Sequence, residues 1–332
     1  LAIVKDELKA VKKEFGAERR TLLTGAAVSG SDGDAAAPSG PKQDIELWVS
    51  KDAQAIALQR PLKRTKKIPL NITSSDLPVA CIECDTESQI LVFTASGLCY
   101  RVRAGEIGVD QAKGKGRALC ALGKGDRVIA AYNADDVKAL ALVTDDGLVK
   151  RIGEEVLSQA HAGGYEVIGL KSGSVLAALA HDEKAEVLVH TLLGKALRTQ
   201  LDPVRIVKGG GAGGVALMKL AEGDRIVSAA LAQGDHLLVV HGEGMGKLVP
   251  LQEYPTKGRG GGGVASASPD KPAKGPAGEI AGAWPIAGDK FILVGQDGSW
   301  EEFSVSEIPA GMRATVSKDL PFGVPGMILP AE

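Results

Sequence analysis

Aromatic residues are scarce in this chain of 332 residues, at 4%, so a folded core must be built from Val, Ile, Leu and Ala. No run of 18 apolar residues occurs, so no membrane-spanning helix is expected. The charged N-terminus lacks the apolar segment of a secretory signal, which predicts a cytoplasmic protein. A net charge of −2 argues against indiscriminate binding to nucleic acid.

Cysteine and histidine are also rare, at four and five residues. Cys81 and Cys84 form a CxxC, but a metal site needs a second ligand pair, and none is near. In a strand, their odd separation points the two thiols to opposite faces. The histidines have no chelating spacing and no P-loop is present. We therefore predict reduced, buried thiols and expect neither metal nor cofactor.

Glycine, in contrast, is abundant (43 residues) and marks an internal repeat. An apolar strand, a glycine turn and a basic strand recur, followed in most copies by a glycine-rich basic loop. The turn glycines recur every 47 to 54 residues, and they are Gly97, Gly147, Gly194, Gly244 and Gly298. The copies lie at 45–67, 89–117, 138–164, 186–214, 236–263 and 290–305. A period near fifty is typical of propellers and solenoids.

A second apolar strand separates successive copies. These stretches are 75–83, 125–131, 172–180, 223–232 and 278–287. One unit is thus a hairpin, a long loop and a further strand, and six units span 45 to about 330. Strands of small and β-branched residues with glycine turns predict an all-β fold for 44–332.

Residues 1–24 differ from the repeats because Leu1, Val4, Leu8, Val11 and Phe15 form one apolar helical stripe. The predicted N-terminal helix could pack on the β-domain or could end a coiled coil from a larger upstream protein. Residues 25–43 read as a flexible linker, because Gly, Ser, Ala, Pro and Asp dominate them.

Basic residues cluster at equivalent places in each repeat, whereas acids collect in other turns. In a ring of blades, equivalent positions share radius and height, so the cations would form a belt matched to a duplex backbone. The alternative is that these cations only protect edge strands from aggregation. The predicted DNA contacts are Arg60, Lys63, Arg64, Lys66, Lys67, Arg101, Arg103, Lys113, Lys115, Arg117, Lys150, Arg151, Lys195, Arg198, Arg205, Lys208, Lys247, Lys257 and Arg259.

Two other function classes have less support from the sequence. A propeller scaffold for protein partners would need clustered aromatic or Arg hot spots, but Trp48, Trp284 and Trp300 are scattered. A propeller enzyme would need convergent polar residues in the central channel, and none recurs. The loops KGGGAGG and KGRGGGG lead into strand rather than helix, so they do not form a dinucleotide site.

Several stretches carry a family resemblance, and EVLVHTLLGKALRT, GAGGVALMKLAEGDRIVSAAL and HGEGMGKLVPLQEYPTKGRGGGGV are the clearest. They resemble the C-terminal domain of the A subunit of bacterial type IIA DNA topoisomerases, which are DNA gyrase and topoisomerase IV. The N-terminal KDELKAVKKEFGAERRTLL resembles the coiled-coil exit of that subunit's cleavage core.

The resemblance implies a six-bladed β-pinwheel with strands exchanged between blades, and a basic perimeter that bends double-stranded DNA. It also implies two protein partners, which are the dimeric cleavage core formed by the rest of the A subunit, and the ATPase B subunit. The isolated domain is expected to be monomeric and nucleoid-associated. The strand-cutting Tyr of the family lies upstream, and none of Tyr100, Tyr132, Tyr165 and Tyr254 has its surroundings.

Gyrase carries a Q-R-R-G-G-K-G box in its first blade, and this chain departs from it. The first repeat reads LQRPLKRTKKIPL, without glycines. The nearest match is a degenerate box in the fifth repeat, formed by Lys257, Gly258, Arg259, Gly260, Gly261, Gly262 and Gly263. This departure argues against strong gyrase-type wrapping. The resemblance therefore implies a gyrase A domain that bends or weakly wraps DNA and presents it to the cleavage core for ATP-dependent supercoiling, with the equivalent domain of topoisomerase IV as the alternative.

Overall fold

Each repeat opens with an antiparallel hairpin, as the alternation of strand and turn signals predicts. The hairpins are β1 (Asp44–Ser50) with β2 (Gln54–Gln59), β4 (Gln89–Thr94) with β5 (Leu98–Arg103), β9 (Ala139–Thr144) with β10 (Leu148–Gly153), β13 (Glu186–Thr191) with β14 (Lys195–Gln200), β18 (His236–His241) with β19 (Met245–Pro250), and β22 (Lys290–Val294) with β23 (Trp300–Ser304). The five repeating turn glycines have φ between 77° and 91°, a region that disfavours other residues. Ala53, at φ 57°, takes this place in the first hairpin.

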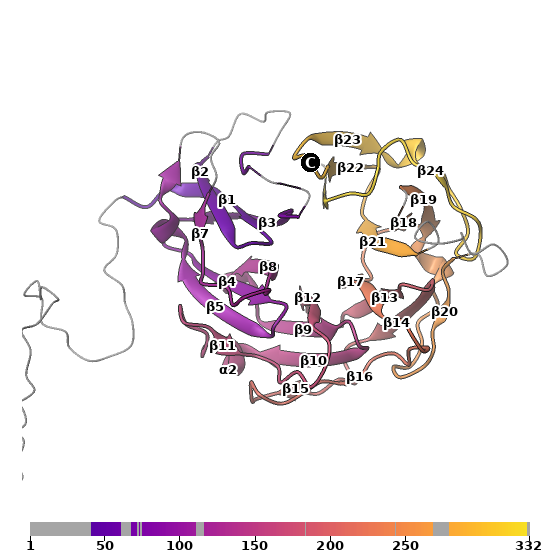
Figure 1. Cartoon of the computed structure of the whole chain (residues 1–332), viewed down its shortest axis with the longest axis horizontal. Helices are drawn as coiled ribbons and strands as arrows, with labels where there is room; N and C mark the ends of the chain where they lie inside the picture. The colour runs from indigo at the N-terminus through magenta and orange to yellow at the C-terminus, as the bar shows by residue number, and fades with distance from the viewer. Residues whose placement is uncertain are drawn as a thin grey trace, which may run out of the picture. The chain divides into compact units, whose positions relative to one another are not determined.

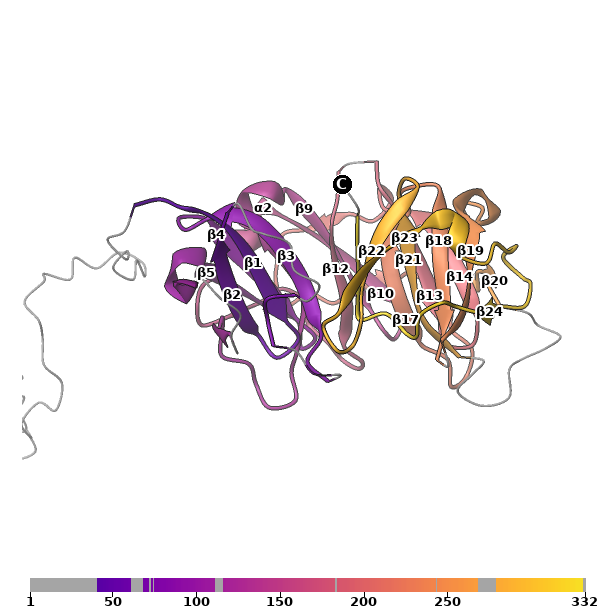
Figure 2. The same cartoon turned by 90° about the horizontal axis from the view of Figure 1, so that it is seen from above.

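The computed structural model describes residues 41–330 except 61–67, 72, 74, 111–115, 183, 243 and 268–278. The second apolar strand of each repeat pairs with the first strand of its own hairpin. These inner strands are β3 (Pro78–Asp85), β8 (Val128–Asn133), β12 (Val175–Ala180), β17 (Ile226–Leu231), β21 (Ile280–Ile286) and β25 (Met327–Pro330). They lie toward the middle of the ring, and the strands run across its thickness (Figures 1 and 2). The sequence prediction missed β25.

The outermost strands come from the neighbouring repeat. After leaving its own hairpin, the chain crosses to the outer strand of the preceding blade and adds one or two short strands there. The donated strands are β6 (Val109–Asp110) and β7 (Arg117–Ala118) on β2, β11 (Tyr165–Glu166) on β5, β15 (Ile206–Val207) and β16 (Val215–Ala216) on β10, β20 (Val264–Ala265) on β14, and β24 (Lys318–Asp319) on β19. The strand exchange expected from the resemblance is therefore present.

The core consists of six apolar clusters, one between each pair of neighbouring blades. In β18, Leu237 and Val239 belong to the cluster shared with blade 4, whereas Leu238 and Val240 belong to the one shared with blade 6. Both faces of each sheet are thus buried, which explains why the strands read as apolar runs rather than alternating ones. The sixth cluster joins Trp48 of blade 1 to Val294 of blade 6 and closes the ring.

Ring closure also uses the backbone, since the Ile68 N–H donates to the Gly298 carbonyl at 3.1 Å. The described chain is therefore all-β with six blades in a propeller-like ring, as predicted. Its short helical turns are η1 (Ala104–Ile107), η2 (Ala134–Asp136), α2 (Glu154–Leu157), η3 (Leu251–Glu253) and η5 (Val305–Glu307). None of the described helices is long and apolar enough to cross a membrane. The predicted helix 1–24 and most of the linker 25–43 fall outside the described residues.

Candidate nucleic-acid interface

The glycine-rich loops lie outside the donated strands, at the periphery of the ring (Figure 1). On blade 3, β15 runs parallel to β10 and β16 returns antiparallel to it, so residues 208–214 form the turn between them. On blade 4, residues 257–263 lie between a parallel bridge at Thr256 and β20. We call 208–214, 257–263 and the equivalent 311–317 on blade 5 the rim loops.

The blade 4 rim loop contacts residues 216–219, the segment that follows the blade 3 rim loop. The Lys219 N–H donates to the Gly261 carbonyl at 3.0 Å, and the Gly260 N–H donates to the Leu217 carbonyl at 2.6 Å. The Arg259 guanidinium donates to the Ala216 carbonyl at 2.9 Å. Five exposed cations lie in these two rim loops or close to them in the sequence, and we call them together the rim patch: Arg205, Lys208, Lys219, Lys257 and Arg259.

The rim patch leaves its cations available to a ligand. Lys208 pairs with Glu155 at 3.2 Å, but both side chains are mostly exposed, at 78% and 59%. An exposed pair of this kind contributes about 0–1 kcal/mol and exchanges readily for a phosphate. Most backbone N–H groups of 257–263, and all those of 209–214, donate to no group in the described part of the chain. Cations beside free N–H groups are the chemistry that binds phosphate.

Lys150 was predicted to contact DNA, but its side chain is buried, with 1% exposure. Its ammonium donates to four backbone carbonyls, those of Val167, Gly209 and Ala212 at 2.8 Å and of Gly210 at 2.5 Å. Burial lowers the pKa of Lys150 to about 8, while Glu166 opposes that shift. An ammonium enclosed by carbonyls cannot reach a DNA phosphate, so Lys150 is not a direct contact.

Lys247 repeats this arrangement on blade 5. It is 1% exposed, and its ammonium donates to the carbonyls of Arg313 at 2.8 Å and Thr315 at 2.7 Å in the third rim loop. Burial, with a smaller effect from Arg313, lowers the pKa of Lys247 to about 8. Lys150 and Lys247 both stand three residues after a turn glycine. A lysine recurs at this position because its ammonium holds the carbonyls of a rim loop.

The arginines one position further along hold neighbouring blades together. Arg151 is 6% exposed and donates to the carbonyls of Leu201 and Val204 at 2.9 Å and of Asp202 at 3.3 Å, all after the next blade's hairpin. Arg101 donates to the Leu157 carbonyl at 3.1 Å. These two arginines span the blade 2–3 and blade 3–4 boundaries, and the buried Arg151 is likewise removed from the predicted DNA contacts.

Arg198 makes the same kind of contact at the blade 4–5 boundary, where its guanidinium lies 3.4 Å from the Leu251 carbonyl. It also pairs with Glu186 at 2.6 Å, and both side chains are about 20% exposed. Its charge is therefore already engaged inside the fold.

The remaining predicted contacts are scattered. Arg60 pairs with Glu83 at 2.6 Å, Arg117 donates to the Ile107 carbonyl at 2.6 Å, and Lys195 is exposed at the start of β14. Six others fall outside the described residues, and they are Lys63, Arg64, Lys66, Lys67, Lys113 and Lys115.

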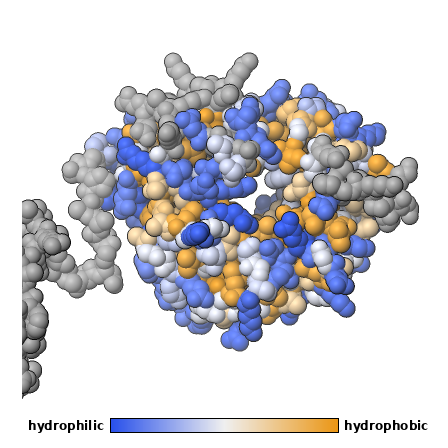
Figure 3. Space-filling view, viewed as in Figure 1, coloured by the Kyte–Doolittle hydropathy of each residue, from blue (hydrophilic) through white to orange (hydrophobic). Residues whose placement is uncertain are grey.

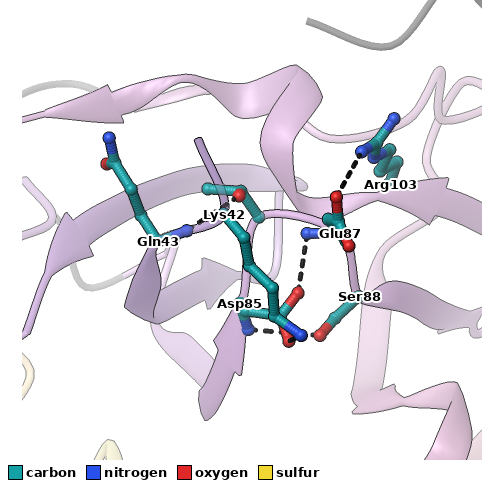
Figure 4. A network of polar contacts seen from close by, with 7 residues as sticks. Lys42, Gln43, Asp85, Glu87, Ser88 and Arg103 are labelled. Atoms are coloured by element: carbon teal, nitrogen blue, oxygen red, sulfur yellow. Dashed lines mark hydrogen bonds and ion pairs between the residues drawn. The ribbon is translucent and has the colours of Figure 1, made fainter. Parts of the chain in front are cut away.

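Arg103 belongs to a polar network at the junction of blades 1 and 2 (Figure 4). Its guanidinium lies 3.8 Å from Glu87, whose N–H donates to Asp85 at 2.7 Å. Lys42 pairs with Asp85 at 3.0 Å, and that hydrogen bond is the main cause of the raised pKa of Lys42. The network ties the chain entering blade 1 to the β3–β4 turn.

Acids also recur for a structural reason. Asp126 accepts from the Ser96 N–H at 2.9 Å, and Asp224 accepts from the Leu193 N–H at 3.0 Å, so each caps a hairpin turn. Blade 6 differs, because Glu301 and Glu302 are exposed on its outer strand. Lys290 pairs with Glu302 at 2.7 Å, and the predicted contacts Lys63, Arg64, Lys66 and Lys67, which precede Ile68 in the sequence, fall outside the described residues. Hydrophilic surface nevertheless predominates along much of the ring's edge (Figure 3).

Sequence reasoning missed two rim cations, Lys219 and Lys318, both exposed. Each lies at or just beyond a short donated strand, and no glycine-rich phrase adjoins Lys318. Strand donation from the following repeat would have placed both on the rim.

The described residues hold no cluster of three or more His, Cys, Asp or Glu side chains suited to a metal. All four cysteines are free. Burial raises the pKa of Cys99 to about 12 and those of Cys84 and Cys120 to about 11, so these thiols are protonated at neutral pH. Cys81 and Cys84 are only half-buried, less than predicted.

The repeats match a known family model, the DNA gyrase C-terminal domain, beta-propeller. The match covers 88–135, 138–180, 185–233 and 235–270, one stretch for each of blades 2 to 5 and together just over half of the chain. This chain belongs to that family. The resemblance read from the sequence is thereby confirmed.

Gyrase A subunits are among the similar curated proteins. The chain is 28% identical over 284 residues to the A subunit of DNA gyrase from Mycolicibacterium smegmatis, covering 81% of this chain and 33% of that protein. It is 27% identical over 323 residues to the corresponding protein of Aminobacterium colombiense, covering 93% of this chain and 38% of that protein. The chain therefore spans about a third of the length of these relatives.

Two solved structures share the fold. The C-terminal domain of DNA topoisomerase IV gives a TM-score of 0.70 at 22% identity, covering 86% of this chain and 93% of that one. The DNA gyrase A C-terminal domain gives 0.65 at 21% identity, covering 86% and 99%. At these identities the likeness supports the fold alone.

Proposed function

We propose that the ring binds duplex DNA along its rim, without sequence preference, and bends it for a type IIA topoisomerase. The rim patch is the observation that supports this most directly. It combines five exposed cations with free backbone N–H groups on the rim loops of blades 3 and 4. Such a surface recognises phosphates and carries no contacts that would read base edges.

The DNA would follow only part of the ring's circumference. Exposed Glu301 and Glu302 disfavour phosphate on the outer strand of blade 6, where Lys290 pairs with Glu302 at 2.7 Å, so the duplex would follow the rim of blades 1 to 5 most closely. Bending two to three helical turns costs on the order of 1–6 kcal/mol, which several phosphate contacts would offset.

In this proposal the chain performs no chemistry itself. Strand cleavage would belong to the remainder of an A subunit, whereas ATP hydrolysis would belong to a B subunit. The isolated chain would be monomeric and would show neither DNA cleavage nor ATPase activity.

The family offers two roles, strong DNA wrapping as in gyrase and DNA bending as in topoisomerase IV, and the position of the degenerate box bears on the choice. Arg259 and the four consecutive glycines that follow it lie in the blade 4 rim loop rather than in the first repeat. That displacement favours bending of the topoisomerase IV kind over strong gyrase-type wrapping. Ligation of nicked circles with bound protein distinguishes them, since wrapping shifts the linking number positively and bending alone leaves it unchanged.

Salt dependence tests DNA binding itself. With about six phosphate contacts, the slope of log K against log salt is about −5, so affinity falls roughly a thousandfold between 50 and 200 mM salt. Binding that ignores salt would contradict the proposal. Partners that survive nuclease treatment in a pull-down would instead favour a protein scaffold.

A further inference from the structure

Lys150 is an unusual core residue, because its buried ammonium faces carbonyls and no carboxylate accepts its hydrogen bonds. Removing a charge from water is costly, and an apolar side chain of similar length would fill this space without that cost. Three of the four acceptors lie in one rim loop, at Gly209, Gly210 and Ala212. The lysine therefore fixes the conformation of that loop.

Fixing the carbonyls also fixes the N–H groups. In a trans peptide the C=O and the following N–H point in opposite directions. Carbonyls of Gly209, Gly210 and Ala212 aimed at Lys150 direct the N–H groups of Gly210, Gly211 and Gly213 away from it. None of these three N–H groups donates to any part of the chain that the structure describes.

The loop itself requires glycine for this arrangement. A Cβ on Gly210 would collide with the Glu166 backbone carbonyl, and a Cβ on Gly169 would collide with the Gly211 carbonyl. The loop thus packs its backbone directly on the neighbouring loop. Gly210 is buried in that contact, whereas the rest of 208–213, including Lys208, is exposed.

We propose that Lys150 is the positioning residue for phosphate binding by the rim loop 208–214. It does not touch DNA, but it presents the N–H groups of the exposed Gly211 and Gly213 to a backbone phosphate beside the ammonium of Lys208. This inference rests on the proposed DNA-binding function. It adds that the glycine-rich loop binds phosphate through its uncharged backbone N–H groups.

The neighbouring blade supplies a comparison within the same molecule. At the position equivalent to Lys150, blade 4 has the buried Leu197. Its rim loop is held instead by the Gly260 N–H and the Arg259 guanidinium. Loss of Lys150 should therefore release 208–214 and leave 257–263 in place.

The test compares Lys150→Met with Lys208→Met in the full chain, using a 30-base-pair duplex over a series of salt concentrations. Lys150→Met should weaken binding about tenfold, the loss expected for one charge-assisted hydrogen bond. Its salt slope should stay unchanged, because the lost donors are neutral. Lys208→Met should reduce the slope by about one, as removal of a direct cation contact does.

A second measurement covers the case in which Lys150→Met does not fold. Amide hydrogen exchange of the wild-type chain, with and without the duplex, should show protection of Gly211 and Gly213 by DNA. Lys150→Gln, which keeps two donors, should retain part of the affinity.

The outcomes separate the two proposals. A wild-type chain that does not bind the duplex refutes the DNA-binding function. Wild-type binding with a folded Lys150→Met of equal affinity overturns the role of Lys150, as does a salt slope reduced by one in that variant. Unprotected loop amides in the wild-type complex overturn it as well.

Discussion

Arg151 in repeat 3 and Arg205 in repeat 4 look alike as cations in the sequence, but the structure gives them opposite roles. Arg151 is 6% exposed and donates to carbonyls across the blade 3–4 boundary, whereas Arg205 is exposed on the rim. Replacing each by Met therefore produces two separable effects. Arg151→Met should lower stability and Arg205→Met should weaken DNA binding.

The magnitude for Arg151→Met follows from its acceptors. The hydrogen bonds to the Leu201 and Val204 carbonyls are buried, and the Leu201 carbonyl keeps a second donor in the Val204 N–H. A buried acceptor left without its donor costs about 1–3 kcal/mol. The Leu201 carbonyl, which loses one of its two donors, adds a smaller cost, and Met avoids the desolvation cost of the guanidinium. The net loss in the free energy of unfolding is about 2–3 kcal/mol.

Thermal and urea unfolding, followed by circular dichroism, measure the first effect. A loss of 2–3 kcal/mol lowers the midpoint by about 4–8 °C in a domain of this size. Fluorescence anisotropy of a labelled duplex measures the second effect. Arg205→Met should reduce the salt slope by about one and leave the midpoint within about a degree.

The reasoning fails if the two variants exchange their effects. Arg151→Met with wild-type stability and a reduced salt slope would mean that Arg151 contacts phosphate. An Arg205→Met variant that unfolds early would mean that the rim cation serves the fold.

Three further changes test other parts of the structure. Arg259→Gln should keep the bond to the blade 3 rim but reduce the salt slope of duplex binding by about one, as measured by anisotropy. His190 is fully buried, and burial, with a smaller effect of Lys247, lowers its pKa to about 3. The unfolded chain takes up that proton first, so the free energy of unfolding should fall below pH 6.5 by about 1.4 kcal/mol per pH unit, and His190→Phe should remove this contribution to the slope in urea titrations. Gly263 has φ 71° and a Cβ there would meet the Ala196 carbonyl, so Gly263→Ala should cost about 2–3 kcal/mol in thermal unfolding.

Each of these has its own control. For Arg259, a salt slope that does not change would place the guanidinium outside the interface. For His190, the two proteins should differ least in pH dependence above pH 7.5, where the imidazole is neutral in both states. His181, whose pKa burial also lowers, leaves a smaller acid slope in His190→Phe, so a slope equal to that of the wild type would refute the assignment. For Gly263, the matched variant is Gly258→Ala in the same loop, where a Cβ would meet nothing within 4 Å. Equal losses at Gly263 and Gly258 would contradict the steric argument.

The repeat itself could be predicted because its signals are periodic. Turn glycines with positive φ and apolar runs buried on both faces recur in register, so hairpins and inner strands follow from the sequence. β25 was missed because its apolar run, Met327–Pro330, is short and precedes no further hairpin, unlike the other five inner strands. The donated strands of two residues, such as β15, are too short to carry any period.

The candidate interface was predicted less well, because a sequence shows charge but not the direction of a side chain. Lys150 and Arg151 are adjacent in one strand, so their side chains must leave opposite faces of a sheet that is buried on both sides. That argument was available from the sequence and would have identified both as interior. Lys208, Lys257 and Arg259 stand beside glycines in loops, where no strand packing constrains them, and they are exposed as expected.

Strand donation has a consequence for how the chain is made. The outer edge of each blade from 1 to 5 is completed by residues that follow the next hairpin, so a nascent chain always ends on a sheet with an open border. Synthesis of one more repeat supplies the strands that pair with this open edge and creates a new open edge on the next blade. The final seam forms only when Val294 and Gly298 leave the ribosome and meet Trp48 and Ile68, which were translated more than two hundred residues earlier.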